Sequence, residues 1–223
     1  MSKENGVIYR ISGPVVTAVG ISPRMYEVVR VGDEGLMGEV IELHGDQSVI
    51  QVYEETSGVR PGEPVVRTGQ TLSVQLGPGL LTKIYDGIQR PLPELEKTMG
   101  VFIKRGVDAD GLDLEKIWDF NATAKKGDSV SSGDVIGTVQ ETKTIEHKVM
   151  VPPGVSGKIK DIKSGDFNVT QTVCTLEDGT EIQMMQKWPV RTPRPFTKKH
   201  APEVPLQTGQ RILDFLFPLA KGG

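Results

Sequence analysis

The feature that most constrains the fold is a series of short apolar runs, separated by turn residues, between residues 7 and 76. Such runs, recurring at roughly 8–12 positions, are typical of a small all-β barrel or sandwich. Short strands leave unpaired edges unless the sheet closes on itself. We therefore predict an antiparallel six-stranded barrel over residues 1–76, with strands near 7–11, 15–19, 26–31, 38–43, 48–53 and 72–76.

The composition fits a soluble, turn-rich protein with an aliphatic core. The chain holds 26 Gly and 15 Pro among 223 residues, and its net charge is −3. This charge offers no general attraction to nucleic acid or anionic membrane. A single cysteine excludes an internal disulfide, and Cys174 is predicted to be a small core residue. Without a signal-like segment or a run of 18 apolar residues, we expect an intracellular chain and no membrane span.

Residues 77–117 change in character and are predicted to be a connector with a short helix. Leu92, Leu95, Met99 and Phe102 recur at helical spacing. Prolines 91 and 93 suit the first turn of such a helix, because proline lacks only an N–H that would have no partner there.

Residues 118–188 are predicted to form a second β domain with internal symmetry. The segment carries a weak repeat at an offset of 38 residues, which pairs Lys125, Gly127, Asp128 and Val135 with Lys163, Gly165, Asp166 and Val173. We interpret this repeat as a pseudo-two-fold β-sandwich of the barrel-sandwich-hybrid kind. The turns Gly127-Asp128 and Gly165-Asp166 are expected at one end of each half.

The C-terminal part is predicted to be a linker followed by the start of another domain. Residues 189–207 are rich in proline and carry basic residues, namely Arg191, Arg194, Lys198 and Lys199, as expected of an extended linker. In residues 208–223 the stretch Ile212–Leu219 is apolar nearly all round, which is typical of a buried helix. We expect the chain to be the front part of a longer protein.

The sequence offers no clear catalytic, nucleotide-binding or metal-binding residues. His44, His147 and His200 stand apart, and no second cysteine accompanies Cys174, so a zinc site is not predicted. Residues 154–159 contain a Gly-Lys pair, but the glycine spacing and the following Ile depart from a phosphate loop. His44 is expected at a hairpin tip.

Three separated segments resemble the catalytic A subunit of archaeal A-type and vacuolar-type rotary ATPases. Residues 51–58 match its N-terminal barrel, residues 85–92 match a signature segment, and residues 208–223 resemble the start of its nucleotide-binding domain. The signature residues are Tyr85, Asp86, Gly87, Gln89, Arg90, Pro91, Thr208, Gly209, Gln210 and Arg211.

The resemblance implies a complex that makes or hydrolyses ATP coupled to ion translocation. In that family the barrels of three A and three B subunits alternate in a crown, and the 118–188 insert corresponds to a bulge that contacts the peripheral stalk. The Mg-ATP site lies beyond Gly223, so we expect this chain alone to be inactive and without a cofactor. The resemblance also implies a cytoplasmic location on the membrane face through the complex, with neither direct membrane insertion nor nucleic-acid binding.

A second hypothesis concerns the 118–188 domain, which also resembles a biotinyl or lipoyl carrier. Such carriers present one lysine on a tight turn between their halves, and Lys143 falls near that place, although threonines flank it on both sides. A third possibility is that the domain binds a protein partner by itself.

Overall fold

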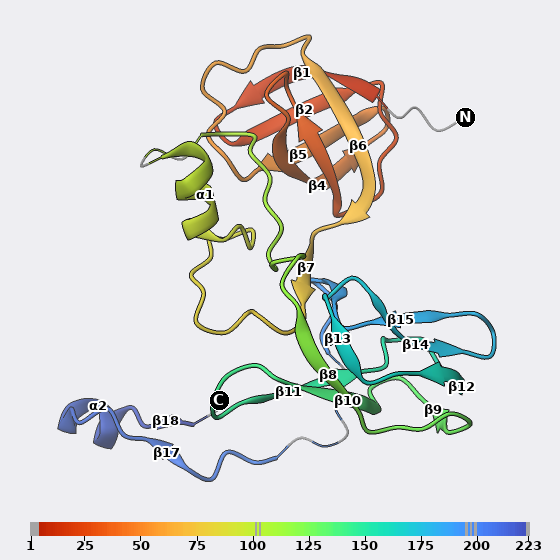
Figure 1. Cartoon of the computed structure of the whole chain (residues 1–223). Coiled ribbons are helices and arrows are strands. Elements are labelled where there is room, and N and C mark those ends of the chain that lie inside the picture. Colours follow the sequence, from red (N-terminus) through yellow and green to blue (C-terminus); the bar gives the residue numbers. More distant parts are fainter. Residues whose placement is uncertain are drawn as a thin grey trace. The chain divides into compact units, whose positions relative to one another are not determined.

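The computed structural model describes residues 5–100, 102, 104–194, 196, 198 and 200–221 (Figure 1). The chain divides into two compact units, Met1–Thr192 and Pro193–Gly223, which are described separately. Pro195 and Lys199 of the expected linker, with Gly222 and Gly223 of the expected domain start, lie outside the described residues. No helix among the described residues is long and apolar enough to cross a bilayer.

The first part of the larger unit is a closed antiparallel barrel, as predicted. Its strands follow the order β1-β2-β5-β4-β3-β6 around the barrel. Alternate residues point inward, so that Val16 and Ala18 of one strand are fully buried while their neighbours are half-buried. The strands are β1 Asn5–Ser12, β2 Val15–Val19, β3 Glu27–Val31, β4 Leu36–His44, β5 Gln47–Val52 and β6 Pro64–Thr71. His44 ends β4 beside the Gly45-Asp46 turn, as expected.

The prediction of the sixth barrel strand was wrong. The barrel is closed by β6, which pairs with both β1 and β3. Residues 72–76 instead supply β7 (Ser73–Leu76), which leaves the barrel and pairs with β16 (Gln186–Pro189). All four residues of β7 are half-buried, whereas Trp188 of β16 is buried. Strand β6 was not predicted because it begins with Pro64, and proline is uncommon within strands. Proline is nevertheless tolerated at the first residue of a strand.

The connector helix is shorter than its apolar spacing predicted. Helix α1 spans Leu92–Met99 and buries Leu95. Pro91 is its N-cap and Pro93 lies in its first turn, as expected. Gly100, with φ of 77°, ends the helix. Phe102 therefore lies outside it and is 84% exposed.

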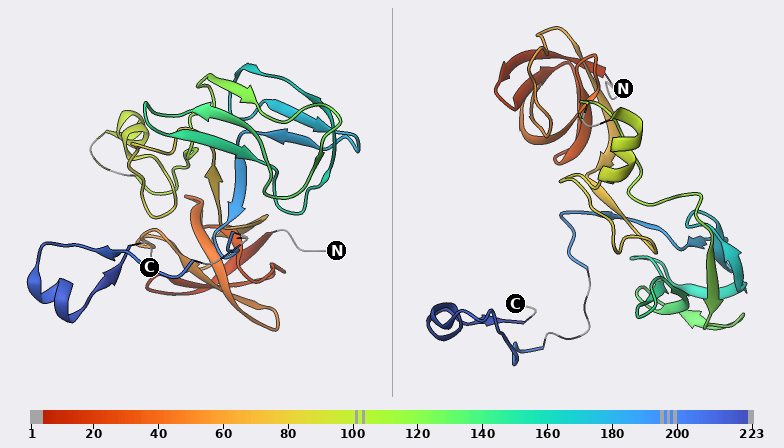
Figure 2. Two further views of the ribbon diagram at one scale, coloured as in Figure 1. Left: turned by 90° about the horizontal axis from the view of Figure 1, so that it is seen from below. Right: turned by 60° about the vertical axis from the view of Figure 1, so that its left-hand side comes forward.

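The second domain is a pair of sheets, as predicted (Figure 2), and the strand orders of the two sheets show its pseudo-symmetry. One sheet has the order β11-β10-β8-β13 and the other β15-β14-β12-β9. Exchanging β8 with β12, β9 with β13, β10 with β14 and β11 with β15 converts each order into the other. The strands are β8 Trp118–Ala122, β9 Ser129–Val130, β10 Val135–Gln140, β11 Glu146–Met150, β12 Gly157–Ile162, β13 Gly165–Phe167, β14 Thr172–Leu176 and β15 Glu181–Gln183.

One of the two predicted turns is a strand. Gly127 lies in a turn with φ of 90°, but Gly165 and Asp166 begin β13 and pair with β8. Strands β9 and β13 each complete the sheet built mainly from the other half of the domain, but β13 begins at Gly165 whereas β9 begins only at Ser129, after the Gly127-Asp128 pair.

The core between these sheets is apolar and includes the only cysteine. Phe120, Ile136, Ile159 and Leu176 are at most 1% exposed. Cys174 is 1% exposed, and burial raises the pKa of its thiol. The prediction that this cysteine is a core residue is confirmed.

The smaller unit contains a short helix and a two-stranded pairing. Strand β17 (Pro205–Leu206) pairs with β18 (Leu219–Ala220), and α2 spans Arg211–Leu216. The helix stops sooner than the predicted apolar stretch 212–219, because the residue before Pro218 disfavours helical backbone. No residue of α2 is buried, and Phe215 is 85% exposed.

The closeness of Gly137 to Phe120 predicts a position that accepts no side chain. A Cβ at Gly137 would lie 2.3 Å from the Phe120 ring, so Gly137→Ala should destabilise the second domain by about 1–3 kcal/mol through overpacking. The matched control is Gly157→Ala, where the new Cβ would meet Leu176 at an ordinary 3.5 Å. Urea unfolding followed by tryptophan fluorescence measures both changes, and equal stabilities of the two variants would contradict this account of the core.

Candidate functional site

The signature segment 85–91 forms a closed loop organised by one carboxylate. Tyr85 and Pro91 form an isolated β-bridge at its two ends. Inside the loop, Asp86 Oδ1 accepts hydrogen bonds from the backbone N–H of Ile88 (3.1 Å) and of Arg90 (2.8 Å). The backbone N–H of Asp86 donates to the Arg90 carbonyl at 3.1 Å. These bonds fix the position from which the Arg90 side chain leaves the loop.

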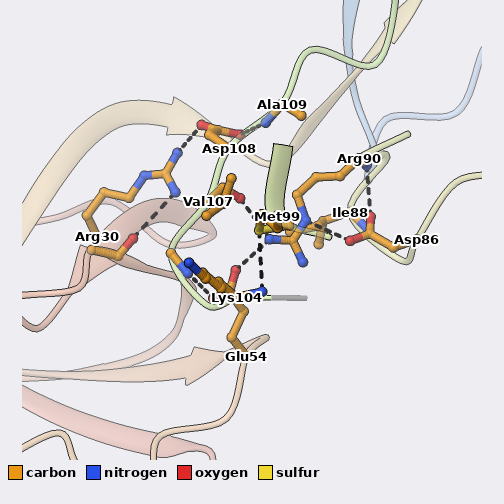
Figure 3. A network of polar contacts seen from close by, with 12 residues as sticks. Arg30, Glu54, Asp86, Ile88, Arg90, Met99, Lys104, Val107, Asp108 and Ala109 are labelled. Atoms are coloured by element: carbon orange, nitrogen blue, oxygen red, sulfur yellow. Dashed lines mark hydrogen bonds and ion pairs between the residues drawn. The ribbon is translucent and has the colours of Figure 1, made fainter. Parts of the chain in front are cut away.

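The Arg90 guanidinium joins three separate parts of the chain (Figure 3). Its Nε donates to Asp86 Oδ2 at 2.7 Å, within the loop. Its Nη1 donates to Glu54 Oε1 at 3.0 Å, just beyond barrel strand β5, and to the Val107 carbonyl at 2.8 Å. The side chains of Arg90 and Glu54 are each only 8% exposed. Breaking a pair buried this deeply leaves an uncompensated charge, which is strongly destabilising.

Residues 104–111, which we call the strap, run alongside the barrel and are held by the carboxylate of Glu54. The backbone N–H of Gly106 donates to Glu54 Oε2 at 2.6 Å. A Cβ at Gly106 would lie 2.1 Å from the Glu34 carbonyl oxygen, and its φ is 70°. Only glycine fits here, since both the backbone conformation and the close approach exclude a side chain.

Two ion pairs, made by Arg105 and Asp108 of the strap, extend its contact with the barrel. Arg105 donates to Glu34 Oε1 at 2.8 Å, and Asp108 pairs with Arg30 of β3. These pairs are more exposed than Arg90 and are expected to contribute little stability each. The strap is therefore held mainly by the two buried side chains, Glu54 through Gly106 and Arg90 through the Val107 carbonyl.

Gln89 attaches the signature loop to the ribbon strand β7. Its amide oxygen accepts from the Gln75 N–H at 2.6 Å, and its amide nitrogen donates to the Gln75 carbonyl at 2.7 Å. The side chain thus occupies the hydrogen-bonding edge that a further strand would use. Gly111 makes room for it, because a Cβ there would lie 2.7 Å from Gln89 Cδ. The Tyr85 hydroxyl donates to the Gly111 carbonyl at 2.9 Å.

The electrostatics of the loop favour an ionised Asp86. Burial alone would raise the pKa of this carboxyl. Hydrogen bonds from the Arg90 side chain and from the backbone N–H groups of Arg90 and Ile88 outweigh burial and hold the pKa below its ordinary value.

The arrangement is that of a structural junction. The side chains of Tyr85, Gln89 and Arg90 bond to other parts of the chain, and Asp86 bonds to Arg90 within the loop. Among the described residues, no group of three or more His, Cys, Asp or Glu side chains could hold a metal ion. A cavity of about 390 Å³ lies beside the junction, and its lining residues include Arg30, Gln89, Asp108 and Lys187.

The second signature group is organised around Asp214 in the smaller unit. Asp214 accepts hydrogen bonds from the N–H of Thr208 (2.9 Å) and of Gly209 (3.1 Å), and from the Thr208 hydroxyl (2.7 Å). The N–H of Gln210 donates to the Thr208 hydroxyl at 3.2 Å, and Arg211 begins α2. The ten signature residues therefore form two separate groups, 85–91 and 208–211.

Sequence reasoning missed the partners of Arg90. Glu54 was included only in a matched segment, and Gly106 and the Val107 carbonyl were not singled out. A usable signal existed, because an arginine between Ile88 and Leu92 in a partly apolar segment needs a buried acceptor when it packs inward.

The position of Lys143 does not fit the carrier hypothesis. The two halves of the second domain are joined by residues 151–156, between β11 and β12, and this connection contains no lysine. Lys143 lies in the hairpin between β10 and β11, inside the first half. The expectation that Lys143 lies near the junction of the halves was wrong, because strands β10 and β11 both precede the connection 151–156 and so belong to the first half.

Removing the guanidinium should destabilise the larger unit strongly. Arg90→Met leaves Glu54 and Asp86 buried without their partner, and we expect a loss of about 3–5 kcal/mol in the free energy of unfolding. Lys97→Met is the control, because the Lys97–Glu94 pair is exposed and should contribute less than about 1 kcal/mol. Urea denaturation compares them, and an Arg90→Met variant as stable as Lys97→Met would contradict the junction.

The lowered pKa of Asp86 predicts a specific pH dependence. Its ionised form stabilises the fold above the ordinary carboxyl pKa of about 3.9, and this contribution disappears as the pH falls through the lowered folded-state value. Asp86→Asn should therefore be less stable than the parent chain near pH 7, and the difference should narrow below about pH 4. Denaturation series at pH 7 and at pH 3 measure this difference, and a gap that widens in acid would contradict the assignment.

Two family models match this chain. Residues 8–69 match the β-barrel domain of the ATP synthase alpha/beta family, and residues 109–191 match the barrel-sandwich domain of ATP synthase alpha/beta subunits. These regions include barrel strands β2 to β5 and the whole of the pseudo-symmetric domain.

Relatives match almost the whole chain. The A subunit of the A-type ATP synthase from Methanosarcina barkeri is 66% identical over 98% of this chain and 38% of its own length. That from Methanoculleus marisnigri is 64% identical over 99% of this chain and 38% of its own length. The chain thus spans well under half the length of these relatives.

Among solved structures, the ATPase EscN of the enteropathogenic E. coli type III secretion system has a TM-score of 0.37 and 27% identity. The match covers 39% of this chain and 21% of the EscN chain. The two family models agree with the barrel and the paired sheets described above. The chain belongs to the ATP synthase alpha/beta family and is related to the A subunits of A-type ATP synthases.

Proposed function

We propose that this chain supplies the non-catalytic β domains of the A subunit in an A-type ATP synthase. The complex would make or hydrolyse ATP coupled to ion translocation across the membrane. The observation that carries the proposal is the identity of 66% over 98% of the chain to such a protein. The geometry supports it, since the signature residues of 85–91 join their loop to the barrel, to the strap and to strand β7, a structural role.

The chain itself is proposed not to bind ATP. Phosphate capture by enzymes of this kind needs a glycine-rich loop with a lysine and a Ser or Thr. The sequence contains no such loop, because Gly157-Lys158 is followed by Ile and lies in strand β12. Mg-ATP would then be held by parts of the full-length protein outside these residues.

The barrel is proposed to assemble with the B subunit in an alternating A3B3 ring. Its outer surface offers apolar side chains on two adjacent strands, with Val7 44%, Tyr9 61% and Val66 39% exposed. Strands β1 and β6 are paired, so these side chains share one face. Exposed apolar groups gathered on one face are typical of a protein–protein contact.

The second domain is proposed to contact the peripheral stalk, on the cytoplasmic side of the membrane. It is an independent pair of sheets joined to the barrel through the β7–β16 ribbon, a suitable position for an additional contact. Binding of the 223-residue chain to purified stalk proteins would support this contact, and the absence of binding at high micromolar concentration would contradict it.

Isothermal titration calorimetry of the 223-residue chain with Mg-ATP tests the proposal that these domains do not bind ATP. We expect no heat of binding, because the phosphate-binding loop is missing. Micromolar, magnesium-dependent binding would contradict the assignment of these domains as non-catalytic. The full-length A subunit, titrated under the same conditions, is the positive control.

A charge on the outer barrel face should weaken assembly without unfolding the barrel. When the full-length A subunit is mixed with the B subunit, Tyr9→Asp should reduce the hexamer fraction on size exclusion by about tenfold or more, since an unpaired charge would be buried at the contact. Thr138→Asp, on a strand of the second domain, is the matched control. Equal hexamer fractions for both variants, with unchanged thermal unfolding, would contradict the proposed face.

A further inference from the structure

A buried carboxylate on the outer side of barrel strand β4 is neutralised by an arginine 152 positions away in the sequence. Glu39 of β4 has a side chain that is only 2% exposed. Its Oε1 accepts from Arg191 Nε at 3.0 Å, and its Oε2 accepts from Arg191 Nη2 at 2.5 Å. The Tyr53 hydroxyl donates to Oε2 at 2.9 Å. A two-point contact of this kind fixes both the distance and the orientation of the guanidinium.

A strained tyrosine completes the arrangement. The Arg191 guanidinium carbon lies 4.3 Å from the ring centroid of Tyr26, a cation–π contact. Tyr26 has φ of 63°, a left-handed conformation that is unusual and unfavourable for a bulky residue. The N–H of Tyr26 donates to the Val40 carbonyl at 2.9 Å, next to Glu39. The barrel thus holds Tyr26 in an unfavourable conformation beside the arginine.

The position of Arg191 in the chain shows which segment this contact attaches to the barrel. Strand β16 returns from the second domain, ends at Pro189, and is followed directly by Val190 and Arg191. The Val190 N–H donates to the Leu72 carbonyl at 2.9 Å, and the Trp188 indole N–H donates to the Thr192 carbonyl at 2.6 Å. The larger unit ends at Thr192. The last residues of this unit are therefore attached to the barrel, not to the second domain.

We propose that Glu39, Arg191 and Tyr26 form a latch that anchors the end of β16 to the barrel. Both strands of the β7–β16 ribbon are then tied to the barrel, β7 by continuity with β6 and β16 through Arg191. The second domain is then an insertion, and the chain segments before and after it are both attached to the barrel. The chain beyond Thr192 consequently starts from a point fixed by the barrel, whatever the second domain contacts. This inference goes beyond the proposed function and does not require ATP synthesis.

The exposures of the two partners show why the latch should stay closed. Arg191 is 53% exposed and could be solvated alone, whereas Glu39 is 2% exposed and could not. Opening the latch would leave Glu39 with only the Tyr53 hydroxyl as a side-chain hydrogen-bond donor. Arg191 is a positioning residue in this proposal, with no part in catalysis.

The experiment distinguishes two roles of Arg191: anchoring the end of β16 to the barrel, or only neutralising the charge of Glu39. Amide exchange of Val190 and Thr192 is measured by NMR in the 223-residue chain, together with its thermal unfolding. Three variants are compared, Arg191→Met, Glu39→Gln and the double variant. Lys126→Met, an exposed lysine of the second domain, is the control and should match the parent chain in both measurements.

The latch predicts faster exchange of both amides in Arg191→Met, on the order of tenfold, because local opening becomes easier. It predicts that the double variant recovers much of the barrel's thermal stability, since the buried charge is gone, while exchange stays fast. Parent-like protection in Arg191→Met would overturn the latch. Recovery of both stability and protection in the double variant would also overturn it, because Arg191 would then only neutralise Glu39.

Discussion

The arrangement of the larger unit depends on one buried guanidinium. Arg90 binds Asp86 within its own loop, Glu54 at the end of β5 and the Val107 carbonyl of the strap. None of these groups could be buried alone without a large desolvation cost. Once Arg90 is in place, the loop, the barrel and the strap can occupy only one mutual arrangement. Conformational specificity of this kind is the role that we assign to the buried pair.

The barrel contacts the rest of the unit through two ion pairs of the same kind. Glu54 and Glu39 are both buried carboxylates on the barrel, and each is neutralised by an arginine from a distant segment. Their partners differ in exposure, since Arg90 is 8% and Arg191 53% exposed. The Arg90–Glu54 contact is therefore buried inside the junction. The Arg191–Glu39 contact lies at the surface of the barrel, beside Tyr26. Together they attach the connector and the end of β16 to a barrel whose own core is aliphatic.

The sequence predicted the elements with strong periodicity and failed where pairing is non-local. Five of the six barrel strands and the symmetry of the second domain follow from apolar alternation and from the repeat at 38 residues. The strand β6 was missed because Pro64 opens it, and residues 72–76 were placed in the barrel because local pattern cannot tell which strand they pair with. The partnership of Arg90 with Glu54 joins residues 36 apart, and such contacts leave no local periodic signal. The helical spacing through Phe102 was overridden by Gly100, whose positive φ ends α1.

The coupling between Arg90 and Glu54 tests the central claim most directly. A double-mutant cycle with Arg90→Met, Glu54→Gln and both changes, measured by urea unfolding, isolates the energy that the two residues share. The account predicts a coupling of about 2 kcal/mol or more, with the double variant clearly more stable than the sum of the single losses implies. Additive losses, with a coupling below about 0.5 kcal/mol, would show that the two side chains act independently and would contradict the junction.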